Sequence, residues 1–394
     1  MSIIFKLEFG ALLAHNLSNS KEKHMNTFTL GIVGGGQLGR MLAHSAQRLG
    51  MRTHVVTDHA HSPAAQVSNT VTLCDLNNLQ TLGRKFFRSV DVVTFEFENV
   101  SVAGLDHLLS HTVTHPHVQV LKTCQDRILE KTFVNTCGIP TAPWRAVQDL
   151  EEFRHTVQEL GMPCVAKTSR MGYDGKGQFV IHSLADCESA WQTLQPHPLI
   201  VEQFVPFVCE VSVVVARNQE GVMVNWDITR NWHQHHILSH SVAPAMLGFG
   251  VDSAAVDHAR ALAHKLGVVG LLAVEMFVLP SGEVWVNELA PRPHNSAHWT
   301  MDACNHSQFD LHVRAVCGLP LVQPLRHSVA HMTNLLGDWC LPQLQQLQSD
   351  ARNVVHWYGK QDAKPGRKMG HVNRIWPRDV HERETVTRIV QEIG

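Results

Sequence analysis

A strand, a glycine-rich turn, a helix and a second strand follow one another between Thr27 and Asp58. The turn reads GGGQLGR, in which Gly34, Gly36 and Gly39 match the G-x-G-x-x-G spacing, and Asp58 lies about twenty residues further on. Such a βαβ unit predicts an α/β domain. Its turn would place backbone amides at a helix N-terminus, which suits a phosphate or a carboxylate, but the motif alone does not name the ligand.

Further strands are predicted at 70–73 and 90–96, and the second ends in the acidic run Glu96-Phe97-Glu98-Asn99. The carboxyl ends of strands are where α/β sheets place their sites. We therefore expect a first domain over about residues 26–122. Residues 1–25 are expected to form a disordered extension, and Met25 could be the working start.

Composition limits the class of protein. A chain of 394 residues is long enough for two or three domains, and 44% hydrophobic with 17% charged residues is ordinary for a soluble globular enzyme. No membrane span is predicted, and a formal charge of -2 gives no general attraction to nucleic acid or to an anionic membrane. Nine cysteines without C-x-x-C spacing indicate reduced thiols in the cytoplasm rather than disulfides or a zinc site.

A glycine-rich basic loop, SRMGYDGKG, lies between strands predicted at 164–167 and 178–181. Glycine lets backbone amides approach phosphates, and Lys176 adds positive charge, although the G-K-[ST] of a Walker loop is missing. Lys167 ends the first strand, where it is costly to bury without an anionic partner. The pattern favours a flap over phosphates; the alternative is a mobile hairpin loop without a ligand.

Two glutamates face each other across a hairpin predicted from strands at 271–279 and 284–288. A two-residue Ser-Gly turn pairs Glu275 with Glu288. Directly opposed side chains lie about 5 Å apart, where like charges destabilise a sheet unless a divalent cation such as Mg²⁺ offsets them. The alternatives are two solvated glutamates, or a bulge that shifts the register so that they never meet. The apolar strands favour a buried metal–nucleotide site.

The other predicted elements are helices at 126–136, 150–160 and 254–266, and strands at 199–204, 210–215 and 223–226. Glu202 and Glu210 lie on two of these strands, and a loop after 223–226 is expected to carry Arg230, His233 and His236. Past Pro320 follows a smaller C-terminal piece.

This order of features resembles the ATP-grasp superfamily. More narrowly, the motifs GIVGGGQLGRM, DRILEKTFVNTCGIPTAPW, RMGYDGKGQ, VNELAPRPHNSAHWT and GRKMGHVN resemble the N5-carboxyaminoimidazole ribonucleotide synthetase family, and the match runs from residue 28 to about 373. The resemblance implies an α/β and α+β protein of ATP-grasp architecture. Its expected parts are a Rossmann-like pre-ATP-grasp domain (26–122), an ATP-grasp domain (123–320, with a flap subdomain at 123–204 and a metal–nucleotide subdomain at 205–320) and a small β-rich C-terminal domain (321–394).

The resemblance also implies an activity. Such an enzyme uses ATP and bicarbonate to carboxylate 5-aminoimidazole ribonucleotide, through carboxyphosphate, in purine synthesis. It implies Mg²⁺ as the cofactor, with Mn²⁺ as a substitute, and a cytoplasmic homodimer that binds neither nucleic acid nor membrane.

Site residues follow from the resemblance position by position. The residues expected to bind ATP are Arg127, Lys167, Gly172, Tyr173, Asp174, Gly175, Lys176, Gly177, Gln178, Glu202, Gln203, Phe204, Val205, Glu210, His233, Asn287 and Glu288. Those expected to bind the ribonucleotide are Tyr173, Asp174, Lys176, His294, Asn295, His298, Lys360 and Arg367. Glu275 and Glu288 would hold the metal, and Arg292 and Lys167 would be catalytic.

Three alternatives stay open at this point. An NAD-binding oxidoreductase could use the glycine turn and Asp58, but it leaves the flap and the glutamate hairpin unexplained. A non-catalytic relative would have lost a glutamate or Lys167, and neither is lost. A formate-using glycinamide ribonucleotide transformylase has a similar layout, and the HNSAHW run favours the carboxylase over it.

Overall fold

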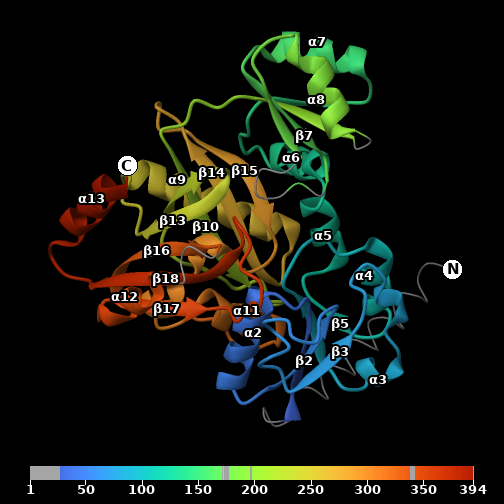
Figure 1. The fold of residues 1–394 in the computed structure, drawn as a ribbon, viewed down its shortest axis with the longest axis vertical. Helices are drawn as coiled ribbons and strands as arrows, with labels where there is room; N and C mark the ends of the chain where they lie inside the picture. The colour runs from blue at the N-terminus through green and yellow to red at the C-terminus, as the bar shows by residue number, and fades with distance from the viewer. Residues whose placement is uncertain (1–26, 171, 173–176, 196–197, 338–341, 394) are drawn as a thin grey trace.

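The structure is a computed structural model that describes residues 27–170, 172, 177–195, 198–337 and 342–393. The expected N-terminal extension and four of the flap residues, Tyr173, Asp174, Gly175 and Lys176, lie outside the described residues. Figure 1 shows the small flap sheet at the top, the N-terminal domain at the lower right and a large sheet between them.

The N-terminal domain contains a parallel sheet, as the βαβ pattern predicted. Its strands are ordered β3 (Thr70–Leu73), β2 (Arg52–Thr57), β1 (Thr29–Val33), β4 (Val92–Phe95) and β5 (Val113–Thr114). The helical segments are α2 (Gln37–Arg48), η2 (Leu79–Thr81), α3 (Arg84–Phe87), α4 (Val102–Leu109) and α5 (Val118–Cys124). Successive strand residues point to opposite faces, so Ile32 packs with α2 while Val33 packs with α4.

The flap subdomain begins with α6 (Arg127–Thr136), which Asp126 caps through its side chain. An antiparallel sheet follows in the order β6 (Trp144–Val147), β9 (Leu199–Gln203), β7 (Cys164–Thr168) and β8 (Gln178–Ile181). Helices α7 (Leu150–Leu160) and α8 (Asp186–Leu194) cover one face of it (Figure 1). The opposite face therefore carries Lys167 and Glu202 towards the rest of the molecule.

The large sheet is ordered β15 (Val284–Ala290), β14 (Gly270–Val278), β10 (Cys209–Arg217), β12 (Thr229–Gln234), β13 (Ile237–Ala243), β16 (Ser328–Leu336), β18 (Lys368–Pro377) and β17 (Asn353–Trp357), and β11 (Met223–Asn225) pairs with β10. Helix α9 (Phe249–Leu266) packs on one face, and η3 (Asn295–Ala297), α10 (Thr300–Ala303) and α11 (Gln308–Val316) lie against the other. Helices α12 (Leu344–Ser349) and α13 (Glu382–Ile393) belong to the C-terminal segment. The strands of that segment continue the same sheet.

The sequence analysis placed Arg230 and His233 on a loop. This prediction is wrong, because both residues lie on β12. This strand hydrogen-bonds to β10 and β13, and its register shifts between Trp232 and His233. Neighbouring strands thus override a polar sequence that reads as a loop.

The glutamate hairpin has the predicted pairing but not the predicted turn. Leu279 pairs with Glu283 across three residues, and Gly282 takes the positive φ of 87° that such a turn requires. That turn shifts the register by one residue, and a bulge at Asn287 shifts it back. Glu275 therefore still pairs with Glu288.

Candidate functional site

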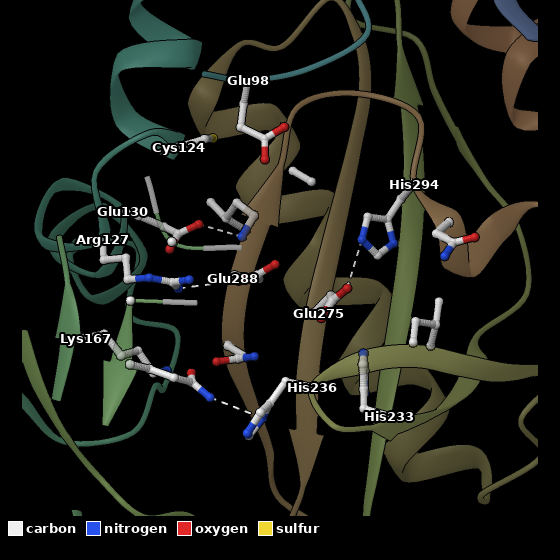
Figure 2. Close-up of a pocket in the computed structure, with 18 of the residues that line it drawn as sticks. Glu98, Cys124, Arg127, Glu130, Lys167, His233, His236, Glu275, Glu288 and His294 are labelled. Carbon is white, nitrogen blue, oxygen red and sulfur yellow. Dashed lines mark hydrogen bonds and ion pairs between the residues drawn. The ribbon is translucent and has the colours of Figure 1, made fainter. Parts of the chain in front are cut away.

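A cleft of about 810 Å³ lies between the three sheets, and Figure 2 shows the side chains around it. Of the predicted site residues, those that line it are Arg127, Lys167, Gly172, Gly177, Gln178, Glu202, Gln203, Phe204, Val205, Glu210, His233, Glu275, Asn287, Glu288, Arg292, His294, Asn295 and His298. Lys360 and Arg367 are not among its lining residues. The structure thus brings residues from 127 to 298 to one place.

A cationic cluster stands on the flap side of the cleft. The Nζ atom of Lys167 lies 2.6 Å from Glu202, and that of Lys131 lies 3.4 Å from the other oxygen of the same carboxylate. Burial alone would raise the pKa of Glu202, but the two lysines outweigh it and lower that pKa to about 2. Two lysines with one carboxylate leave a net positive charge, which suits a phosphate chain.

The bulge on β15 gives the glutamate pair its geometry. It sets Asn287 and Glu288 together opposite Glu275, so that all three line the same cleft. His294 lies 2.9 Å from Glu275, and Arg127 lies 3.4 Å from Glu288 (Figure 2). Burial would raise the pKa of Glu275, but His294 and His233 outweigh it and lower that pKa to about 2.

These residues fit a hard divalent cation. Two carboxylates face one space, and the buried Oδ1 of Asn287 has no hydrogen-bond partner within the described residues. Oxygen ligands of this kind are those that Mg²⁺ takes, with phosphates and water completing its shell. No group of three or more His, Cys, Asp or Glu side chains that could hold a metal occurs in the described part of the chain.

Helix α6 supplies residues that the sequence analysis missed. Glu130 accepts a 2.5 Å hydrogen bond from the backbone of Leu289, and Lys131 lies 3.5 Å from the carbonyl of Val286. They hold the chain on both sides of the bulge, while Arg127 contacts Glu288 itself. Burial raises the pKa of Glu130 to about 8. The i, i+3, i+4 spacing of the three α6 residues was the available signal, because it places them on one helix face.

Backbone amides of the glycine turn hydrogen-bond to a side-chain carboxylate of the same chain. Glu96 accepts hydrogen bonds from the backbone amides of Gly36 and of Gly39, the latter at 2.7 Å. A Cβ atom on Gly34 would lie 2.2 Å from Cγ of Glu96, so the turn requires glycine to admit this side chain. The amides that would hold a dinucleotide are therefore already bound, which argues against the oxidoreductase alternative.

Arg292 is held at the cleft by Glu98, from the acidic run after β4. Their side chains form a two-pronged ion pair, with Nη2 donating to Oε1 at 2.9 Å. Burial would raise the pKa of Glu98, but Arg292 outweighs it and lowers that pKa. The arginine is thus fixed in orientation before any substrate binds.

His233 and Glu210 lie side by side on β12 and β10 and form a hydrogen bond. Burial would lower the pKa of His233, but Glu210 outweighs it and raises that pKa. Nδ1 of His236 accepts a 3.1 Å hydrogen bond from Nε2 of Gln178, which joins the large sheet to the flap strand β8 (Figure 2).

The C-terminal basic residues Lys360 and Arg367 contact backbone carbonyls of their own segment. The Nζ atom of Lys360 donates to the carbonyl of Lys368 at 2.6 Å, and Arg367 donates to the carbonyl of Asp362 at 2.9 Å. Lys368, which the sequence analysis did not select, lines the cleft. The substrate-binding role of Lys360 and Arg367 stays a prediction.

The fold and the cleft define an ATP-grasp protein. Residues 132–309 match the ATP-grasp domain, and residues 26–125 match the ribonucleotide synthetase preATP-grasp domain. Residues 330–383 match the phosphoribosylaminoimidazole carboxylase C-terminal domain.

None of the described helices has the length and apolar character needed to cross a membrane.

The relatives are more specific. The chain is 43% identical over 354 residues to an N5-carboxyaminoimidazole ribonucleotide synthase from Brucella melitensis, covering 89% of this chain and 97% of that protein. An ADP complex of an N5-carboxyaminoimidazole ribonucleotide synthetase superposes with a TM-score of 0.86 at 38% identity, covering 93% of this chain and 98% of that one. An Aspergillus clavatus N5-carboxyaminoimidazole synthase in complex with ADP and 5-aminoimidazole ribonucleotide gives 0.86 at 30% identity, covering 94% and 99%. The chain belongs to the N5-carboxyaminoimidazole ribonucleotide synthase family.

Proposed function

We propose that this chain is a ligase that carboxylates 5-aminoimidazole ribonucleotide to N5-carboxyaminoimidazole ribonucleotide in purine biosynthesis. The reaction consumes ATP and bicarbonate and releases ADP and phosphate. One observation carries the proposal: a single cleft holds the cations of β7 and α6, the paired glutamates of the hairpin and a preoriented arginine. Its relatives in complex with ADP and the ribonucleotide support the same substrates.

ATP would lie between the flap sheet and the large sheet. Lys167 and Arg127 would contact its phosphates, and the strand end from Glu202 to Val205 would line the adenine. Glu210, with His233 beside it, would reach the ribose. A magnesium ion held by Glu275 and Glu288 would neutralise phosphate charge during transfer.

Bicarbonate would bind at Arg292, whose planar guanidinium fits an oxyanion. A bicarbonate oxygen attacks the γ-phosphorus, the bond to ADP breaks, and carboxyphosphate forms. The exocyclic amine of the ribonucleotide then attacks the carboxyl carbon, phosphate leaves and the nitrogen loses a proton. Carboxyphosphate hydrolyses readily in water, so the reaction needs a site from which water is excluded.

The ribonucleotide would occupy the opposite end of the cleft, beside His294, Asn295 and His298. Both polar atoms of the Asn295 side chain are buried and have no partner within the described residues, so they are available to a polar ligand. Lys360 and Arg367 would contact its phosphate. We also propose a homodimer, which light scattering of the purified protein tests.

The decisive experiment measures phosphate release by the purified protein with ATP, magnesium and 5-aminoimidazole ribonucleotide, with and without bicarbonate. We expect release that depends on both the ribonucleotide and bicarbonate. Glycinamide ribonucleotide with formate serves as the comparison. Activity with that pair alone, or no activity with the aminoimidazole, would reject the proposal.

A further inference from the structure

Gln308 contacts His298, one of the residues that line the cleft, through a side-chain hydrogen bond. The side chain of Gln308 is fully buried at the start of α11. Its Oε1 accepts the backbone N–H of His294 at 2.8 Å, and its Nε2 donates to the carbonyl of the same residue at 2.7 Å. A backbone N–H can only donate and a carbonyl can only accept, so this amide has a single allowed orientation.

The orientation of Gln308 determines the tautomer of His298. Nε2 of Gln308 lies 3.0 Å from Nδ1 of His298, and a carboxamide nitrogen only donates. Nδ1 must therefore accept, which places the proton of a neutral imidazole on Nε2. A protonated His298 ring would place its Nδ1–H against an N–H of the Gln308 amide, so this contact disfavours the imidazolium.

Packing holds the same ring in place. His298 lies against Phe309 at 5.6 Å and against His371 at 4.7 Å between ring centroids. Tyr358 forms a 2.8 Å hydrogen bond with Nδ1 of His371, and His356 stacks on His371 at 4.5 Å between ring centroids. Among the described residues no hydrogen bond engages Nε2 of His298, a residue that lines the cleft.

The bases and charges around His298 come from several elements. His294 lies on the chain just before η3, Arg292 follows β15, and His356, Lys368 and His371 lie on β17 and β18. Asp302 on α10 accepts hydrogen bonds from Asn373 at 2.6 Å and pairs with His356 at 2.8 Å. Burial first, then the positive charge of these neighbours, lowers the pKa of His298 well below its usual value.

We infer that Gln308 is a positioning residue that keeps His298 as a neutral Nε2–H donor aimed at a hydrogen-bond acceptor of the ribonucleotide. His298 then binds and orients the substrate and does not act as the base that removes the amine proton. This inference rests on the proposed function for the identity of the ligand, but not for the tautomer. Nothing in the hydrogen bonds of Gln308 depends on a bound substrate.

The tautomer is tested first, on the free enzyme. Nitrogen NMR of protein carrying ¹⁵N-histidine, with His298 assigned from its loss in His298→Gln, should give a neutral ring protonated at Nε2 between pH 6 and 9. A proton on Nδ1, or a titration of His298 within that range, would overturn the inference. Gln308→Met should release the ring into a mixture of tautomers; if it does not fold, the wild-type spectrum decides alone.

Steady-state kinetics then test whether His298 acts as a hydrogen-bond donor to the ribonucleotide or as a general base. His298→Gln keeps an N–H near the position of Nε2, so its kcat should stay within about ten-fold of wild type, whereas His298→Ala should raise KM for the ribonucleotide about ten-fold. A general base would behave differently: His298→Gln would lose about 10²- to 10⁴-fold in kcat, and the acid limb of the pH profile would be lost with it. Both losses together would overturn the inference. The exposed His264→Gln on α9 is the matched control. An inactive wild type would reject the proposed function and leave the NMR result standing.

Discussion

Lys167 donates a 2.6 Å hydrogen bond from Nζ to Oε2 of Glu202, across the neighbouring strands β7 and β9. The carboxylate is 3% exposed and also pairs with Lys131, which comes from α6. One buried acid therefore joins the flap sheet to the helix that holds the glutamate hairpin. Lys167, which we propose to contact the phosphates of ATP, thus also takes part in tying the flap subdomain to the metal side of the cleft.

Replacing Glu202 with glutamine should destabilise the protein. The change leaves the buried Lys131 and the partly buried Lys167 without a carboxylate, and breaking a buried ion pair in this way typically costs about 3–5 kcal/mol. Urea unfolding at pH 7 would measure it, with Glu151→Gln on the exposed side of α7 as control, expected within about 0.5 kcal/mol of wild type. Equal unfolding free energies for Glu202→Gln and Glu151→Gln would contradict this prediction, and would mean that water reaches the two lysines once the carboxylate is lost.

The difference between wild type and Glu202→Gln should depend on pH. The pKa of this carboxyl is about 2 in the folded chain and about 4.3 when unfolded. A depressed folded pKa stabilises the protein above the unfolded value, and that stability is lost as the pH falls towards 2. The difference in unfolding free energy should therefore be constant between pH 6 and 7 and smaller at pH 3.5. A gap that widens on acidification would contradict this assignment.

The hairpin shows how far sequence reasoning reached. Alternation and a turn signal predicted that Glu275 faces Glu288, and this pairing is confirmed. The three-residue turn and the bulge at Asn287 were not predicted, because each shifts the register by one residue and the two shifts cancel. The bulge shifts the in/out alternation of β15 by one residue, so that Asn287 and Glu288 both line the cleft.

Glu288→Gln should lower ATP turnover by about two to three orders of magnitude while the fold stays intact. The neutral side chain weakens the metal site and removes a charge that repels Glu275, so the variant should melt no lower than wild type without magnesium. Phosphate release and calorimetric magnesium titration in the presence of ATP would measure both effects.

The same hairpin offers the control for this metal assignment. Glu283 is exposed beside the turn, and Glu283→Gln removes an equal charge outside the cleft. Its turnover should match wild type. Near-normal activity of Glu288→Gln would remove this residue from the metal site, and an equal loss in both variants would point to a general effect of charge.

The glycine turn marks a limit of motif reading. G-x-G-x-x-G was found in its proper place between a strand and a helix, but the motif did not reveal what its amides bind. Glu96, some sixty residues later, occupies them. Contacts at such sequence separation follow from the order of strands in the sheet, which a local pattern does not encode.

Nucleotide selectivity follows from that contact. ATP with magnesium should raise the melting temperature, because a ligand at a thousand times its Kd stabilises the native state by about 4 kcal/mol. NAD or NADH at the same concentration should produce no shift, since Glu96 would have to leave the amides of Gly36 and Gly39. Differential scanning fluorimetry decides between them. Stabilisation by the nicotinamide nucleotide but not by ATP would overturn the family's activity for this chain.

Arg367→Ala should weaken binding of the ribonucleotide without affecting ATP. Arg367 donates to the carbonyl of Asp362, and its neighbour Lys368 lines the cleft. Loss of one charge-assisted contact to the substrate phosphate is worth about 1.5–3 kcal/mol, which corresponds to a ten- to hundred-fold rise in KM for the ribonucleotide. Because that phosphate is remote from the reacting amine, the ATP dissociation constant should stay within about two-fold.

Steady-state titration of both substrates measures this, with Arg388→Ala, which replaces an exposed arginine on α13, as the matched control. If Arg367→Ala leaves KM for the ribonucleotide unchanged, Arg367 only caps the Asp362 carbonyl, and the phosphate contact must come from Lys360 or Lys368.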